Sequence, residues 1–173
     1  MLALVLGIAW AGLVACLLCR AVRQFRAFRD ATLRASADIS GLPAVSIIVP
    51  VRNEIANLSP CLAGLTAQTC LSGKSSIIFV DDDSQDGTLP VLQHQAALDP
   101  RIRLITLGRL AEDWVGKPRA CWRGALAAET DWLCFIDADV RAAPRLVASA
   151  LAFAVAEGAD MLSLHPLQEL GSF

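Results

Sequence analysis

Two aspartates, Asp137 and Asp139, stand one residue apart at the end of an apolar run that begins at Trp132. Side chains two residues apart in an extended segment point to the same side, so both carboxylates can face one ligand. Mg²⁺ or Mn²⁺ commonly binds one or two such carboxylates together with phosphate oxygens of a substrate. The pair therefore predicts a metal site for a phosphorylated substrate, although an isolated D-x-D pair is more often a solvated strand end.

Further polar residues follow other apolar runs. Asp82 lies in "DDD" at the end of the second run and can offer a carboxylate to the base or ribose of a nucleotide. Asp86, four residues later, is expected to cap the next helix. Lys117 follows Gly116 at a predicted helix start, where its charge and the backbone N–H groups favour phosphate. A lone surface lysine is the alternative interpretation of Lys117.

The apolar pattern predicts that strands and helices alternate from residue 44 onward. Continuous apolar runs predict buried strands at 44–51, 75–83, 102–107, 131–137 and 160–166. Helical spacing predicts helices at 56–68, from about 88 to 98, at 117–129 and at 144–157. This order indicates an α/β fold with an open, mostly parallel sheet. Ligands of such sheets bind beyond the carboxyl ends of the strands, where the polar residues above occur.

The N-terminal region has a different character. Residues 1–19 carry no charged side chain, and at about 1.5 Å per residue they are long enough to cross a bilayer as a helix. Five arginines follow closely, which marks that flank as cytoplasmic: Arg20, Arg23, Arg26, Arg29 and Arg34. We expect a retained transmembrane helix over 1–19, a basic juxtamembrane segment and linker over 20–43, and a domain on the cytoplasmic side of the cell (inner) membrane. A buried soluble helix is the alternative.

Composition excludes several other classes. The net charge of −2 gives no indication of nucleic-acid binding. The six cysteines and two histidines do not form the spacing of a zinc site or a disulfide framework. We therefore expect free, mostly buried thiols in a domain that faces the cytoplasm.

Four motifs carry a resemblance to a known family. They are "VSIIVPVRNE", "IIFVDDDSQDGT", "GKPRACWRGA" and "FIDADV", in this order between about residues 45 and 141. Together they resemble family 2 glycosyltransferases of the GT-A fold. The stretch "DWVGKPRACWRG" and the apolar N-terminus look most like the hopene-associated branch, which is similar to ceramide glucosyltransferases.

The resemblance implies an inverting, metal-dependent hexosyltransferase that uses a nucleotide-diphosphate sugar as donor. It implies Mg²⁺ or Mn²⁺ as cofactor, held at the donor diphosphate by Asp139 and Asp137. It places the following residues around the donor: Pro50, Arg52, Asn53, Glu54, Asp82, Gly116, Lys117 and Asp137. The chain departs from the family at Asp83, where relatives often have Gly. The implied acceptor is a lipid of the hopanoid or sphingolipid type.

The catalytic base is missing from these motifs. In the resembled family it lies in an acceptor-binding half, so we expect it beyond residue 173, and the Gln/Arg-x-x-Arg-Trp signature is absent. Residues 44–173 are therefore expected to be the donor and metal half of a truncated domain. One alternative is a non-catalytic, membrane-anchored remnant that binds nucleotides. Another is a nucleotidyltransferase, which would need a Gly-rich basic loop where this chain has "PVRNE".

Overall fold

The chain divides into two compact units, residues 1–34 and 35–173, and the computed structural model describes residues 10, 12–23, 41–69, 73–108 and 116–165. In the first unit, residues 12–23 are helical and carry exposed leucines such as Leu13 and Leu17. None of the helices in the described ranges has both the length and the apolar character needed to cross a bilayer. Much of the predicted span over 1–19 and of the basic segment over 20–43 lies outside those ranges.

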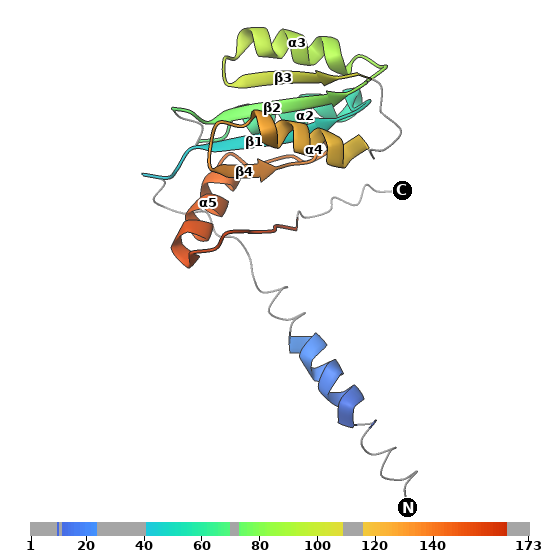
Figure 1. Cartoon of the computed structure of the whole chain (residues 1–173), viewed down its shortest axis with the longest axis vertical. Helices are drawn as coiled ribbons and strands as arrows, with labels where there is room; N and C mark the ends of the chain where they lie inside the picture. Colours follow the sequence, from blue (N-terminus) through green and yellow to red (C-terminus); the bar gives the residue numbers. More distant parts are fainter. Residues whose placement is uncertain (1–9, 11, 24–40, 70–72, 109–115, 166–173) are drawn as a thin grey trace, which may run out of the picture. The chain divides into compact units, whose positions relative to one another are not determined.

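The second unit contains a four-stranded parallel sheet. Its strands are β1 (Val45–Val51), β2 (Ser76–Asp82), β3 (Ile102–Leu107) and β4 (Trp132–Phe135). They lie in the order β3-β2-β1-β4 (Figure 1). The predicted α/β fold with a parallel sheet is therefore confirmed. Because parallel strands all end at the same edge, the loops after β1, β2 and β4 are brought together.

Helices cover both faces of this sheet. They are α2 (Ile55–Thr66), α3 (Thr88–Leu98), α4 (Gly116–Ala127) and α5 (Leu146–Glu157). Side chains from α2, α3 and α5 pack into one large core cluster with alternate residues of β1 and β2. On the other face, Ala120 of α4 packs in a smaller cluster with Ile48, Ile78 and Val80.

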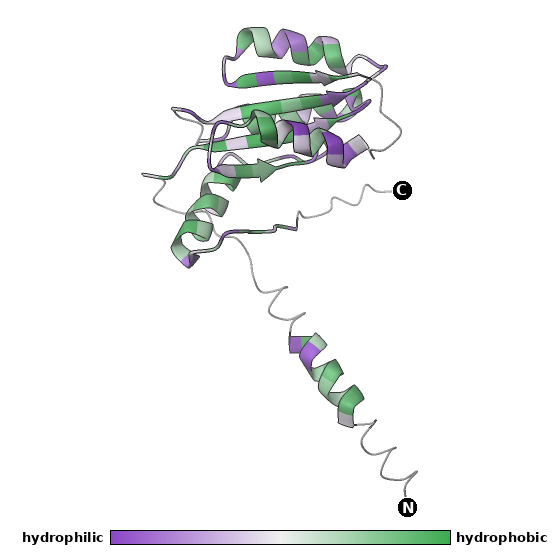
Figure 2. Cartoon of the chain, viewed as in Figure 1, coloured by the Kyte–Doolittle hydropathy of each residue, from purple (hydrophilic) through white to green (hydrophobic). Residues whose placement is uncertain are grey.

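The central strands are apolar on both sides because both sides are covered. Ile47 points into the large cluster and its neighbour Ile48 into the small one, and both are fully buried. In a strand with only one buried face, apolar residues would instead alternate with polar ones. Hydropathy follows this arrangement: the strand centres are hydrophobic, and hydrophilic residues lie at strand ends and on parts of α3 and α4, while α5 is mostly hydrophobic (Figure 2).

Helix α4 lies unusually close to the sheet at Gly124. A Cβ at this position would be 2.5 Å from Ile48 Cγ2, closer than real side chains approach. The absence of a side chain at Gly124 therefore allows α4 to lie directly on β1 and β2. This contact places the first residues of α4 beside the carboxyl ends of the two strands.

Two sequence predictions differ from the structure. Residues 160–165 of the predicted fifth strand form no strand, and Met161 there is largely exposed. A strand needs a neighbour to satisfy its backbone groups, and within the described residues 160–165 pair with no strand. The fourth strand is also shorter than predicted, since β4 ends at Phe135 although Ile136 N still donates to Ile48 O at 3.0 Å.

Candidate functional site

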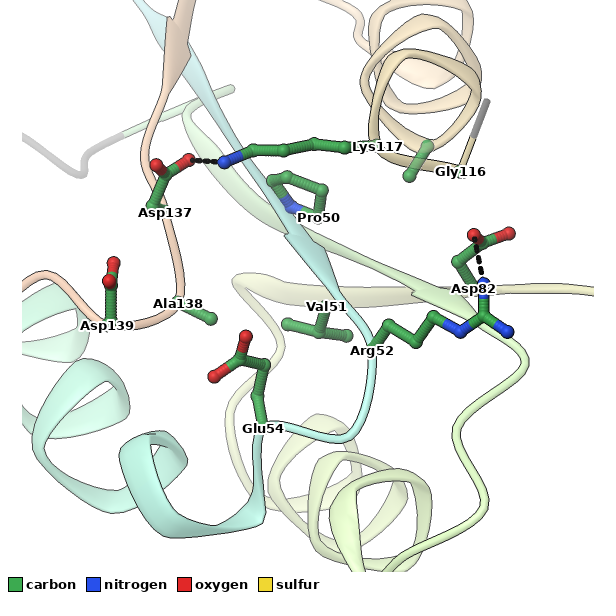
Figure 3. Close-up of a pocket in the computed structure, with 11 residues that line it drawn as sticks. Pro50, Val51, Arg52, Glu54, Asp82, Gly116, Lys117, Asp137, Ala138 and Asp139 are labelled. Atoms are coloured by element: carbon green, nitrogen blue, oxygen red, sulfur yellow. Dashed lines mark ion pairs between the residues drawn. The ribbon is translucent and has the colours of Figure 1, made fainter. Parts of the chain in front are cut away.

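A pocket of about 260 Å³ opens at the carboxyl edge of the sheet (Figure 3). Four segments supply its walls: the end of β1, the end of β2, the start of α4 and the loop after β4. The lining residues are Pro50, Val51, Arg52, Glu54, Asp82, Gly116, Lys117, Ala120, Asp137, Ala138 and Asp139. With the exception of Asn53, every donor or metal residue predicted from the sequence lines this pocket.

Asn53 lies outside the pocket lining and connects two loops. Its backbone is in the left-handed region with φ 56°, which Asn tolerates better than most residues. Its backbone N–H donates to Ser84 Oγ at 2.9 Å, and its Oδ1 accepts from the Gln85 backbone N–H at 2.7 Å. Asn53 therefore holds the loop after β1 against the loop after β2, and its contact with the donor stays a prediction.

Asp86 strengthens the same connection. Its Oδ1 accepts from the Thr88 backbone N–H at 2.9 Å, and its Oδ2 accepts from the Ile55 backbone N–H at 3.2 Å. The carboxylate thus binds the first residues of both α3 and α2. A hydrogen bond with the Thr88 side chain is the main reason that the pKa of Asp86 lies below its ordinary value. The bonds from the backbone N–H groups of Thr88 and Ile55 lower it further. The expected capping role of Asp86 agrees with these contacts, although Gly87 occupies the N-cap position.

Asp82 forms the buried wall of the pocket. It is only 3% exposed, and two arginines approach it: Arg119 NH1 lies 3.5 Å from Oδ1, and Arg52 NH1 lies 3.8 Å from Oδ2. Oδ2 is buried and has no hydrogen-bond partner among the residues that the structure describes. A buried acceptor without a partner is costly and calls for an explanation such as a ligand. Asp82 therefore offers a fixed acceptor to an N–H or O–H group of a molecule in the pocket.

Gly116 makes room for this carboxylate. A Cβ at Gly116 would be 2.6 Å from Asp82 Oδ2, so another residue here would displace either the helix start or the carboxylate. Arg119, one turn later in "GKPR", also donates to Gly108 O at 3.0 Å. We did not single out Arg119 from the sequence; its only signal was its position three residues after Gly116, on the side of the helix that reaches the end of β2.

The other end of the pocket carries Lys117 and the two aspartates. Lys117 Nζ lies 2.8 Å from Asp137 Oδ1, and both side chains are more than half exposed. The hydrogen bond to Asp137 is the main reason that the pKa of Lys117 is raised. Asp139 is exposed and makes no hydrogen bond or ion pair with the part of the chain that the structure describes. The sheet edge thus carries one paired and one unpaired carboxylate beside a cation.

The geometry that brings Asp137 and Asp139 together is a turn. We expected the two side chains to share one side of an extended segment, but residues 137–140 fold back, with Val140 N donating to Asp137 O at 3.1 Å. Both aspartates nevertheless line the pocket, while Ala138 between them is buried.

Helix α2 supports this turn from behind. At Gly64 a Cβ would be 2.7 Å from Ala142 O, so the helix and the loop touch through their backbones. Gln68 Nε2 donates to Ala143 O at 2.7 Å and to Gly64 O at 2.9 Å, and Gln68 Oε1 accepts from the Val147 backbone N–H at 3.1 Å. The carboxylate loop, residues 136–145 between β4 and α5, is therefore held by the buried side chain of Gln68, two residues beyond the end of α2.

The two aspartates fit a hard divalent cation of the Mg²⁺ or Mn²⁺ type. Such ions take oxygen ligands and retain water or substrate phosphate in the remaining positions, so one or two protein carboxylates suffice. Asp139 lines the pocket and has no ion-pair partner within the described ranges, and Asp137 is its neighbour across the turn. Within the described residues, no cluster of three or more His, Cys, Asp or Glu forms a complete protein cage. The arrangement therefore suits an ion that is shared with a phosphorylated ligand.

The whole of this site lies in the region that matches a known family. The model of the family described as "Glycosyl transferase family 2" matches residues 46–169. The chain is 35% identical over 97 residues to 4,4'-diaponeurosporenoate glycosyltransferase of Staphylococcus haemolyticus, which covers 56% of this chain and 24% of that protein. It is 37% identical over 100 residues to an N-acetylglucosaminyltransferase of Bradyrhizobium elkanii, which covers 57% and 52%. The matches thus span from about a quarter to about half of these relatives.

Solved structures show the same fold. The mannosyltransferase PcManGT from Pyrobaculum calidifontis, solved with GDP-Man and Mn²⁺, superposes with a TM-score of 0.64 at 24% identity, over 86% of this chain and 43% of that one. TarS of S. aureus, residues 1–349, gives a TM-score of 0.58 at 22% identity, over 66% and 33%. The family match over most of the chain and this shared GT-A fold lead to one conclusion: the chain belongs to glycosyl transferase family 2.

Proposed function

We propose that residues 44–173 are the donor-binding part of a glycosyltransferase that takes its sugar from a nucleoside-diphosphate sugar. The observation that carries this proposal is the buried Asp82 Oδ2, which has no hydrogen-bond partner among the described residues, at one wall of a pocket whose other end holds Lys117 and two aspartates. An acceptor at one end suits the N–H and O–H groups of a nucleoside. A cation and a metal-binding pair at the other end suit its diphosphate.

The charges at the second end are suited to a diphosphate. Lys117 is the second residue of α4, where the unpaired backbone N–H groups of the first turn also favour anions. Asp139 and Asp137 would hold Mg²⁺ or Mn²⁺ beside it. When bound, such an ion supplies the Lewis acidity that neutralises charge on the departing diphosphate. The protein's own contribution is to orient the donor between Asp82 and Lys117.

The acceptor and the stereochemistry belong to the finer part of the proposal. We propose inversion at the sugar and a lipid acceptor of the hopanoid or sphingolipid type. The resemblance of "DWVGKPRACWRG" to the hopene-associated branch supports the lipid acceptor. The names of two relatives point the same way: one contains 4,4'-diaponeurosporenoate and the other undecaprenyl-phosphate.

Donor binding can be tested directly by calorimetry of the full chain with UDP and with GDP. We expect one of the two nucleotides to bind with Mn²⁺ present and to bind much more weakly with EDTA. Asp139→Asn should weaken this Mn²⁺-dependent binding by about tenfold or more, because it removes a charged ligand of the ion. Asp160→Asn is the matched control, an exposed aspartate away from the pocket lining. Failure of both nucleotides to bind to the folded protein with Mn²⁺ would overturn the proposal.

We also propose that residues 1–19 anchor the chain in the cell membrane with the second unit on the cytoplasmic side. The uncharged run and the arginines after it support this placement. In cell fractionation, the full chain should stay with membranes after a high-salt wash, while residues 35–173 alone should be released. Recovery of the full chain in the soluble fraction after that wash would contradict the anchor.

A further inference from the structure

In the ion pair of Lys117 and Asp137, the ammonium group binds a carboxylate oxygen that could otherwise coordinate a metal ion. Lys117 Nζ lies 2.8 Å from Asp137 Oδ1, and both residues line the candidate donor pocket. Asp139, on the other side of the same turn, has no ion-pair partner in the described part of the chain. Without a donor, the two carboxylates are therefore not equivalent: one is neutralised by an ammonium group and the other is available.

A divalent cation and this ammonium group cannot both use Asp137 well. Both are attracted to the same carboxylate oxygens, and they repel each other across a few ångströms. The negative charge of Asp139 also acts on Lys117, since it is the smallest contribution, after those of Asp137 and Cys121, to the raised pKa of the lysine. Lys117 and a divalent cation would therefore compete for the negative charge of both aspartates.

Lys117 is free to change its partner. Its side chain is 61% exposed, so its movement would leave no cavity in the core. An ammonium group on a flexible stem binds as a point charge and can turn from a carboxylate to a phosphate. The pocket wall beside it is formed by Gly116 at the start of α4, where a diphosphate would find backbone N–H groups as well.

We propose that Lys117 couples donor binding to metal binding. In the donor-free protein its ammonium group neutralises Asp137; when a nucleoside diphosphate enters, the ammonium group moves to the diphosphate and releases Asp137 as the second carboxylate for the ion. This inference rests on the proposed function of the pocket. It assigns to Lys117 the role of a positioning residue whose effect on the metal passes through Asp137.

The coupling has a thermodynamic signature. Mn²⁺ alone should bind weakly, because only Asp139 is available, and a nucleoside diphosphate should tighten Mn²⁺ binding. By linkage, Mn²⁺ must tighten binding of the nucleotide by the same factor. Removing the ammonium group should strengthen Mn²⁺ binding in the absence of nucleotide and shrink the coupling factor.

The test compares Lys117→Met with Lys74→Met in the full chain. Lys74 is exposed before β2, outside the pocket lining, so the control makes the same change of charge and shape elsewhere. Mn²⁺ binding is measured by the loss of the free-ion electron paramagnetic resonance signal, with and without UDP or GDP. We expect Lys117→Met to bind Mn²⁺ alone about threefold more tightly than wild type, as loss of a competing surface ion pair predicts. Lys74→Met should match wild type.

Lys117→Arg keeps the positive charge and should leave weak Mn²⁺ binding close to that of wild type. Lys117→Met that binds Mn²⁺ alone no better than wild type would overturn the inference. So would a coupling factor between Mn²⁺ and nucleotide that is unchanged in Lys117→Met, while the proposed donor site would stand. If neither UDP nor GDP binds to the wild type, the proposed function fails, and the measurement with Mn²⁺ alone still decides whether Lys117 competes at Asp137.

Discussion

At the scale of single residues, the shape of the pocket depends on a glycine as much as on the charged side chains. Asp82 can keep its carboxylate buried at the wall because Gly116 opposite has no side chain. The backbone of Asp83, the residue after β2, has a φ of 63° and lies in the left-handed region. Gly, which the resemblance leads us to expect at this position, adopts this conformation most easily, and Asp is among the residues that tolerate it.

Gly116→Ala should disturb the nucleoside end of the pocket. The added methyl group would lie 2.6 Å from Asp82 Oδ2, and because neighbouring atoms must shift, we expect the free energy of unfolding to fall by about 1–3 kcal/mol. Mn²⁺-dependent nucleotide binding, measured by calorimetry, should weaken by about tenfold, which corresponds to about 1.4 kcal/mol. Gly108→Ala is the control, since a Cβ there meets nothing within 4 Å. Equal nucleotide affinity in the two variants would contradict this account of Gly116.

Cys61 lies beneath the site and reports on its charge. The thiol is fully buried, and burial, with the negative charges of Asp139 and Glu54, raises its pKa from 9.0 to about 11. Between these two values the unfolded chain loses the thiol proton while the folded chain retains it. Ionisation therefore favours the unfolded state as the pH rises. The contribution of the protonated Cys61 thiol to the free energy of unfolding is fully present below pH 9 and is lost toward pH 11.

Urea unfolding of wild type and Cys61→Ala at several pH values tests this effect. The wild type should lose up to roughly 2–3 kcal/mol relative to Cys61→Ala between pH 9 and pH 11, since one pKa unit is about 1.4 kcal/mol. Cys16→Ala removes an exposed thiol and should run parallel to wild type. Parallel pH profiles of wild type and Cys61→Ala would show that Cys61 ionises normally in the fold.

At the scale of elements, the carboxylate loop is held by a helix distant from it in sequence. Gln68, two residues after the end of α2, binds the backbone at Ala143 before α5 and at Val147 within the first turn of α5. The chain between these partners contains β2, α3, β3, α4 and β4. Asp139 therefore owes its position to a contact that only the folded sheet can form.

Gln68→Met should weaken this support without emptying the space. The variant leaves backbone groups of the loop and of α5 without their partner, and we expect a loss of about 2–3 kcal/mol in the free energy of unfolding. Mn²⁺-dependent nucleotide binding should weaken as well, because the loop that carries Asp139 becomes less constrained. Gln93→Met, on the exposed side of α3, is the matched control in urea unfolding and calorimetry. A stable Gln68→Met variant would show that the loop is fixed by other contacts.

At the scale of the whole molecule, the site belongs to one of the two compact units. Every residue that lines the pocket falls within residues 35–173, as do both core clusters. We therefore predict that residues 35–173 fold alone, with a cooperative urea transition, and bind a nucleotide and Mn²⁺ with the affinity of the full chain. Calorimetry on both proteins checks this. A tenfold loss of affinity in residues 35–173 would mean that residues 1–34 contribute to the site.

Much of the fold could be predicted because it follows from local patterns. The runs around Ile47 and Phe79 are apolar on both faces, as expected of a strand that is covered on both sides, and their short length and β-branched residues favour a strand over a buried helix. Parallel strands then force polar residues after β1, β2 and β4 to one edge, so Arg52, Asp82 and Asp137 could be assigned to one pocket. These predictions rest on the spacing of apolar residues along strands and helices, which can be recognised from residues close together in the sequence.

What the tertiary structure decided are the pairings across long stretches of chain. The sequence by itself could not show that Lys117 pairs with Asp137, that Arg119 reaches Asp82, or that Asn53 binds the loop at Gln85. It also predicted a strand over 160–166, whose described residues have no strand neighbour. The physical reason is the same in each case: a local pattern states which groups need a partner, and only the packed sheet and helices determine which partner lies within reach.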